Sequence, residues 1–320
     1  MNDEIGHVLD RQAGVVSRRQ ALAAGLAPHD IRRLLRRRDW AAVHDGVYVD
    51  HTGALPWLQR AWAAVLLAEP AALCHDSAIR AADGPGRRDR SDEAPVHVAI
   101  DRHRKLVLPE GIVPHRMVGL DDKVLWNAGP PRVRIEHAVI DVAAEARTDF
   151  DPIAAISNAV QSRRTTARRL LTALDERRRI GRRAFLEGIL HDVASGACSV
   201  LEHGYLTRVE RPHGLPRANR QLVESSRGPI YRDVEYVAYR MLVELDGRLF
   251  HDSATARDTD LDRDLDAALD RKFTVRLGWG QCFARPCLTA VRIGRLLQQR
   301  GWSGAPVACP HCAGEAAAAG

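Results

Sequence analysis

Acidic side chains recur at alternating positions in one stretch of the chain. Two short runs, Asp233–Val237 and Met241–Asp246, alternate apolar and charged residues on either side of a turn at residues 238–240. This alternation predicts a β-hairpin, because successive side chains on a strand point to opposite faces. We expect one face to be apolar and to comprise Val234, Tyr236, Val243 and Leu245.

The other face of this hairpin is predicted to be acidic. With the turn centred as above, Asp233 lies opposite Asp246 and Glu235 lies opposite Glu244. Carboxylates in such an arrangement repel one another, so they favour a hard divalent cation such as Mg²⁺ or Mn²⁺. Water held by such an ion is a nucleophile for phosphodiesters. The alternative is an amphipathic hairpin whose acidic face is merely solvated.

Two residues after the hairpin favour the metal-site interpretation. Gly247 permits the backbone to bend or to approach another group closely. His251 follows at a distance that lets its imidazole fold back over the carboxylates.

The residues of this stretch resemble a family of restriction-endonuclease-like domains related to the very-short-patch mismatch-repair endonucleases, within the PD-(D/E)XK nuclease superfamily. The resemblance covers residues 195–302. It is carried by Arg232-Asp233, Val243-Glu244-Leu245-Asp246-Gly247, His251 and the charged stretch from Arg257 to Leu269, which contains Arg257, Asp260, Arg263 and Asp264.

The resemblance implies a metal-dependent endonuclease with an α/β core. It implies that Asp233 is the central metal ligand, that Glu244 or Asp246 is a second acidic partner, and that His251 is catalytic. Glu202 would match the family's early acidic residue. The superfamily's lysine after the second acid is replaced here by Asp246, so an inactive nuclease fold is an open alternative.

Residues 1–52 are predicted to form a winged helix-turn-helix. Glu4 to Gln12 is amphipathic, Ser17 is placed to cap the next helix, and residues 29–38 form a basic third helix. A hairpin follows, with its turn at Asp45-Gly46. In such modules the second helix of the motif enters the DNA major groove.

The same module resembles the N-terminal domain of AbiEi-type antitoxins, on residues 16–21, Gly25 and residues 46–48. The resemblance implies operator DNA as a partner and raises a cognate toxin as another. A solvated basic face, or a protein-contact role, is the alternative. The candidate DNA contacts are Arg18, Arg19, Arg32, Arg33, Arg36 and Arg37.

The rest of the chain is divided as follows. Residues 53–150 read as a mixed α/β region without a catalytic signature, with predicted helices at residues 57–68 and 71–81. His75 is interpreted there as a packed or surface residue rather than a ligand. Residues 151–194 read as a basic helical linker whose arginines either steer a phosphate backbone or form a solvated face.

Cysteines near the C-terminus suggest a structural zinc site. Cys309 and Cys312 form a CxxC pair, which is half of a four-ligand site. Cys282 and Cys287 are predicted to complete it, with His311 as a substitute. The alternative is a set of reduced thiols on a flexible tail at residues 303–320.

The whole-chain properties are consistent with this α+β multidomain organisation. At 320 residues the chain is long enough for two domains or more, and its net charge is +6. A chain without a long apolar segment or a signal-like start is expected to be cytoplasmic and to have no membrane partner.

Overall fold

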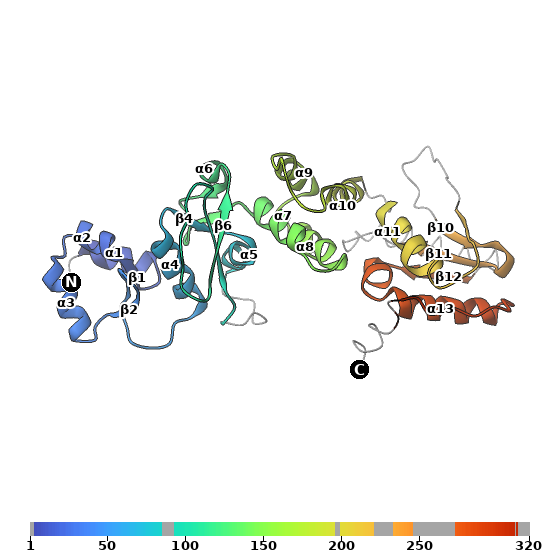
Figure 1. The fold of residues 1–320 in the computed structure, drawn as a ribbon, viewed down its shortest axis with the longest axis horizontal. Coiled ribbons are helices and arrows are strands. Elements are labelled where there is room, and N and C mark those ends of the chain that lie inside the picture. Colours follow the sequence, from blue (N-terminus) through green and yellow to red (C-terminus); the bar gives the residue numbers. More distant parts are fainter. Residues whose placement is uncertain are drawn as a thin grey trace. The chain divides into compact units, whose positions relative to one another are not determined.

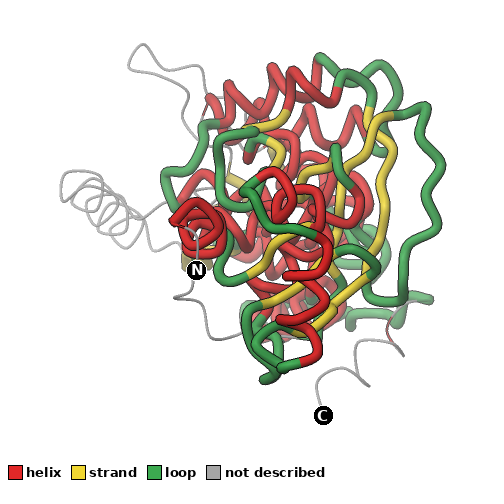
Figure 2. Tube along the Cα trace, turned by 90° about the vertical axis from the view of Figure 1, so that its left-hand side faces the viewer, coloured by secondary structure: helices red, strands yellow, loops and turns green. Residues whose placement is uncertain are grey.

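The computed structural model describes residues 3–84, 93–195, 199–220, 233–245, 273–310 and 312. The chain divides into two compact units, Met1–Val142 and Ala143–Gly320, and each is described by itself. Helices and strands are mixed along the trace, as Figure 2 shows, so the predicted α+β class is confirmed at that level. None of the described helices has the length and apolar character needed to cross a membrane.

The first unit begins with three helices and a three-stranded sheet (Figure 1). Their order is α1 (Asp3–Arg11), β1 (Val15–Ser17), α2 (Arg18–Ala23), α3 (Pro28–Arg36), β2 (Ala41–His44) and β3 (Val47–Val49). The sheet order is β1-β3-β2, with both pairings antiparallel. Strand β1 is absent from the sequence prediction, which had only the two strands of the wing.

Local sequence signals set the boundaries of these elements. The Ser17 side chain accepts a hydrogen bond from the Gln20 amide while the Gln20 side chain accepts one from the Ser17 amide, which is a capping box. Pro28 opens α3, where its missing N–H is of no consequence. Gly46 adopts a φ of 67° in the β2–β3 turn. Ile31, on the inner face of α3, is fully buried in the core of this module.

A five-stranded sheet forms the rest of the first unit. The elements are α4 (Trp57–Ala68), β4 (Ala71–Leu73), α5 (His75–Asp83), β5 (Val96–Asp101), β6 (Ile112–Met117), α6 (Leu120–Lys123), β7 (Val124–Leu125), β8 (Arg132–Val133) and α7 (Ile135–Glu145), which continues into the second unit. The sheet order is β6-β5-β4-β8-β7. Helix α4 packs on the small sheet through Trp62, Ala63 and Leu66.

The predicted helix at residues 71–81 is wrong in its first half. Ala71, Ala72 and Leu73 form strand β4, and the helix begins only at His75. A short apolar run is compatible with a helix or with a buried strand, and pairing with β5 decided the outcome here.

The second unit opens with helices. These are α8 (Phe150–Gln161), α9 (Ala167–Asp175), α10 (Arg183–Ser195) and α11 (Ser199–Gly204), which continues as a π-helical segment at Tyr205–Glu210. Helices α9 and α10 pack against each other.

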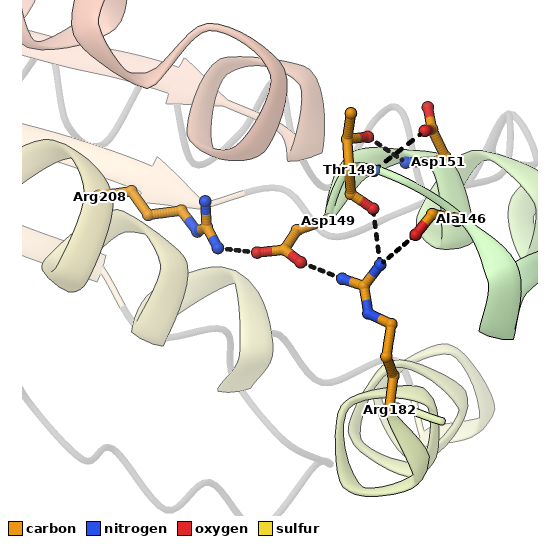
Figure 3. A network of polar contacts seen from close by, with 6 residues as sticks. All are labelled: Ala146, Thr148, Asp149, Asp151, Arg182 and Arg208. Atoms are coloured by element: carbon orange, nitrogen blue, oxygen red, sulfur yellow. Dashed lines mark hydrogen bonds and ion pairs between the residues drawn. The ribbon is translucent and has the colours of Figure 1, made fainter. Parts of the chain in front are cut away.

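One carboxylate joins these helices to the π-helical segment. Asp149 precedes α8 and forms ion pairs with both Arg182 and Arg208 (Figure 3). The Arg182 guanidinium also donates to the carbonyl oxygens of Ala146 at 3.2 Å and Thr148 at 2.8 Å. Arg182 therefore makes internal contacts, although the sequence analysis placed it in a basic linker.

A four-stranded sheet follows, in the order β12-β11-β10-β9. The strands are β9 (Asn219–Arg220), β10 (Asp233–Tyr236), β11 (Met241–Leu245) and β12 (Phe273–Leu277). Strands β9, β10 and β11 pair antiparallel, whereas β11 and β12 are parallel. Val234, Tyr236, Val243 and Leu245 are all buried, which confirms the predicted apolar face of the hairpin.

The register of the hairpin differs from the prediction by two residues. Asp233 pairs with Glu244, which was expected opposite Glu235, and Glu235 pairs with Leu242, whereas Asp246 lies outside the described residues. A 3-10 turn at Val237–Tyr239, followed by Arg240 at a φ of 48°, closes the hairpin earlier than assumed. Because the shift is even, it leaves the assignment of residues to faces unchanged.

The C-terminal part of the unit packs on helix α13 (Pro286–Gln299), which follows a second π-helical segment at Gly280–Ala284. Helix α13, drawn in red in Figure 1, lies against the Tyr205–Glu210 segment, drawn in yellow. The chain then turns back along α13, and Gln298 donates to the carbonyl of Gly304 at 2.8 Å. Pro306 lies so close to Gly294 that a Cβ there would meet Pro306 Cγ at 2.1 Å.

We expect Gly294→Ala to destabilise the second unit by about 1–3 kcal/mol, because the new methyl group overpacks this contact. The midpoint of urea-induced unfolding should fall accordingly. Gly6→Ala in α1 is the matched control, since a Cβ there meets nothing within 4 Å and alanine is the better helix former. Equal midpoints for Gly294→Ala and the wild type would contradict this account.

Candidate functional site

Four side chains from three separate parts of the second unit converge on one point. His213 follows the Tyr205–Glu210 segment, Cys287 lies in the first turn of α13, and Cys309 and Cys312 lie in the C-terminal segment. One ligand atom from each lies within 4.8 Å of all the others. We call these residues the His213 centre.

The distances between ligand atoms in the His213 centre match those around a tetrahedrally coordinated metal ion. Cys287 Sγ and Cys309 Sγ are 3.5 Å apart, Cys309 Sγ and Cys312 Sγ are 3.8 Å apart, and Cys312 Sγ lies 3.6 Å from His213 Nε2. With Zn–S bonds of about 2.3 Å and Zn–N bonds of about 2.0 Å, tetrahedral geometry requires about 3.8 Å between sulfurs and about 3.5 Å between sulfur and nitrogen. A disulfide would need sulfurs about 2.0 Å apart, so these thiols are not bonded to one another.

The imidazole of His213 is oriented for coordination. It is 1% exposed, and its Nδ1 lies 2.9 Å from the carbonyl oxygen of Val209. A carbonyl only accepts, so Nδ1 carries the proton and Nε2 presents its lone pair to the cysteines. This use of the remote nitrogen is typical of metal-binding histidines.

Backbone hydrogen bonds bring the last two cysteines to this point. The amide of Val307 donates to the carbonyl of His213 at 2.9 Å, which ties the C-terminal segment to the residue that supplies the imidazole. The amide of Cys312 donates to the carbonyl of Cys309 at 3.1 Å, closing a tight turn. The amide of Cys309 in turn donates to Cys312 Sγ at 3.2 Å.

The fourth ligand differs from the one predicted. Cys282 is fully buried in the Gly280–Ala284 segment and is not part of the His213 centre. Burial raises the pKa of its thiol to about 12, so it stays protonated at neutral pH. His213 takes its place, and His311, the predicted substitute, lies outside the described residues. Sequence alone offers no way to select His213 among 14 histidines, since it lies far from the cysteines along the chain.

The structure describes part of the acidic hairpin site. Glu244 Oε2 accepts a hydrogen bond from Arg276 Nε at 2.7 Å, and the two residues are register partners on β11 and β12. No donor among the described residues reaches the other oxygen, Oε1. Glu202 lies half-buried on α11. Asp246 and His251 lie outside the described residues, and Asp233 is placed through its backbone as the partner of Glu244.

The six arginines predicted to contact DNA are all exposed, but they differ in their partners. Arg19 pairs with Glu69, Arg33 with Asp30, and Arg37 with Asp39. No acidic side chain among the described residues pairs with the remaining three, which are Arg18, Arg32 and Arg36. Arg32 and Arg36 lie on α3, the helix that follows the turn of the motif.

No family model and no curated protein matches this chain. Among solved structures, the RV2827C protein from Mycobacterium tuberculosis is similar over 55% of this chain and 71% of that chain, at 19% identity and a TM-score of 0.33. A likeness at this level carries no argument about function.

The pKa of Cys282 leads to a prediction about thiol reactivity. In chelator-treated protein at pH 8, iodoacetamide should modify Cys309 and Cys312 and leave Cys282 unmodified. Iodoacetamide reacts with thiolates, and Cys282 is buried and has a pKa of about 12, so its thiol stays protonated at pH 8. Peptide mass spectrometry over a time course gives the order of modification. Modification of Cys282 as fast as Cys312 would show that it is neither buried nor protonated as described.

Proposed function

We propose that this protein binds DNA and hydrolyses its phosphodiesters with a metal-dependent site of the PD-(D/E)XK type. The observation that carries the proposal is the pairing of Asp233 with Glu244 on the two central strands of the second unit's sheet. Directly opposite residues of an antiparallel pair belong to the same face of a sheet, about 5 Å apart at Cβ. Two acids so placed are suited to share one hard cation.

The topology of the sheet supports the proposal. Three antiparallel strands, β9 to β11, are joined by a fourth, β12, which is parallel to β11, with α11 before the strands and α13 after them. The resemblance implies a core with a helix before the strands and a helix after them, and this partial agreement in element order supports a metal site at Asp233 and Glu244.

The environment of the Glu244 carboxylate is suited to binding a cation. Its Oε2 is held by Arg276, the Glu244 side chain is 19% exposed, and within the described part of the chain no donor reaches Oε1. When bound, Mg²⁺ would activate water and stabilise charge on the phosphate. Arg276 places a fixed positive charge beside the acids, in a site where the superfamily's lysine is missing, and is placed to hold a phosphate oxygen. Asp246, Glu202 and His251 keep the roles that the resemblance implies.

In this proposal the three helices and the three-stranded sheet at the start of the first unit bind DNA. The Arg32 and Arg36 side chains are exposed on α3, the Arg18 side chain is exposed at the start of α2, and none of the three is paired with an acid among the described residues. Arginine suits phosphate oxygens and guanine edges, because its planar donors bind both in pairs.

The His213 centre is a structural zinc site in this proposal. A Cys₃His set closes the coordination sphere and leaves no position for a substrate, which is typical of structural rather than catalytic zinc. Zinc there would hold the C-terminal segment and α13 to the residues after the Tyr205–Glu210 segment. Iodoacetamide should then react with Cys309 and Cys312 only after a chelator has removed the ion.

Asp233→Ala should abolish cleavage of a supercoiled plasmid in Mg²⁺ or Mn²⁺, a loss of at least about 10²-fold, while DNA affinity in a gel-shift assay stays the same. Glu235→Gln is the matched control, because Glu235 lies opposite Leu242 rather than an acid and should leave cleavage unchanged. A wild type that cleaves no DNA with either ion would refute the nuclease proposal.

A second candidate is a non-catalytic regulator of the antitoxin type. The ion pair between Glu244 and Arg276 favours it, because an arginine that neutralises the acid removes part of the need for a metal. Such a regulator would bind one DNA sequence near its own promoter. Equal affinity for unrelated sequences would count against it.

The arginines of α3 give a prediction for either candidate. Arg32→Ala combined with Arg36→Ala should weaken DNA binding and lower the slope of log K against log salt by about 2, since each phosphate contact contributes about 1. Arg33→Ala combined with Arg37→Ala is the matched control and should change the slope less, because Asp30 and Asp39 already pair with these side chains. Equal slopes for both double variants and the wild type would exclude α3 from the interface.

A further inference from the structure

A second set of metal-ligating side chains converges in the first unit, outside the nuclease-like site and the His213 centre. Cys74, His75 and His115 each offer one ligand atom, and these three atoms lie within 4.8 Å of one another. Cys74 is fully buried and His75 is 6% exposed, whereas His115 is half-buried. The sequence predicts His75 to be a packed or surface residue, whereas the structure places it in this cluster.

The five-stranded sheet brings these residues together from distant parts of the chain. Cys74 follows strand β4 directly, and its amide donates to the carbonyl of His97 on β5 at 3.0 Å. His115 lies on β6, which pairs parallel with β5. Cys74 follows β4, His75 begins α5 and His115 lies on β6, so the pairing of β5 with both β4 and β6 brings one thiol and two imidazoles together.

His97 orients the imidazole of His115. Its Nδ1 lies 2.9 Å from His115 Nε2, so one of the two nitrogens donates to the other. Because that hydrogen bond uses Nε2 of His115, a bond from this imidazole to a metal would be made by Nδ1. A hydrogen bond on the remote nitrogen fixes the tautomer and direction of a metal-binding imidazole. His97 is therefore a positioning residue.

His75 is held in an uncommon backbone conformation. Its φ is 49°, in the left-handed region that few residues other than glycine adopt. Such strain costs of order 1 kcal/mol or more and persists where the surrounding structure imposes it. Here it places the imidazole 3.8 Å, centroid to centroid, from the ring of His115.

We propose that Cys74, His75 and His115 bind one divalent transition-metal ion with a fourth coordination position open. A thiolate and two imidazoles are the ligands that Zn²⁺ and its neighbours in the first transition row prefer, whereas Mg²⁺ prefers oxygen. Three protein ligands with an exchangeable fourth position are typical of zinc sites that bind water or a small ligand. Binding displaces the thiol proton of Cys74 and turns the stacked rings of His75 and His115 toward the ion.

The proposal is tested on the full chain with Co²⁺ as the probe, after removal of metals by a chelator. Elemental analysis after desalting gives the stoichiometry, and the visible spectrum reports tetrahedral Co²⁺. The test variants are His115→Asn and Cys74→Ser, and His103→Asn is the matched control, because His103 is an exposed histidine just after β5 that is not part of the cluster. Circular dichroism checks that each variant is folded.

We expect His115→Asn and Cys74→Ser each to bind one Co²⁺ equivalent fewer than the wild type, while His103→Asn binds as many as the wild type. In a Cys309→Ser, Cys312→Ser background the remaining Co²⁺ should show weak thiolate-to-cobalt charge transfer, since only one thiolate is left to bind it. If Cys74→Ser does not fold, His115→Asn at its half-buried position supplies the same test. Equal stoichiometry in His115→Asn and the wild type would overturn the proposal and leave a set of stacked, hydrogen-bonded histidines. If the His213 centre binds no Co²⁺, the wild type should bind one equivalent and His115→Asn none. That result would still support the proposal.

Discussion

The contact between the C-terminal segment and the residues around His213 determines the arrangement of the second unit's C-terminal half. His213 contributes to this contact twice. Its carbonyl accepts a hydrogen bond from the Val307 amide, and its imidazole faces the cysteines. The lack of a side chain at Gly294 lets Pro306 lie flat on α13, so that Cys309 and Cys312 reach Cys287. Backbone pairing, close packing and ligand convergence therefore depend on one another.

The elements that the sequence predicts well are those with local signals. The capping residues Ser17 and Gln20, Pro28 at the start of α3, and the turn at Gly46 lie within a few residues of the boundaries that they set. The sequence does not predict strand β1, because its three residues carry little periodicity and pair with β3, which lies 30 to 34 positions away in the chain. Strand β4 is also only three residues long, and its partner β5 is distant in the chain, so its sequence alone predicts a helix.

The candidate sites follow the same division. The apolar face of the hairpin is correct because alternation is a local property, but the pairing of Asp233 depends on the number of residues that the turn takes up. The CxxC turn is visible in the sequence, whereas His213 enters the centre only through folding. Similarly, His75, His97 and His115 are scattered along the chain and meet because β4, β5 and β6 are neighbours in one sheet. The nuclease and antitoxin resemblances remain predictions.

The pairing of Asp149 with two arginines has a practical consequence for handling the protein. The three side chains are between 23% and 37% exposed, so dissolved ions screen their attraction less than they screen charges in open solvent. Contacts between exposed arginines and phosphate weaken steeply as salt increases. A wash at high ionic strength should therefore strip adventitious nucleic acid from the protein while the helices before the sheet remain attached to it.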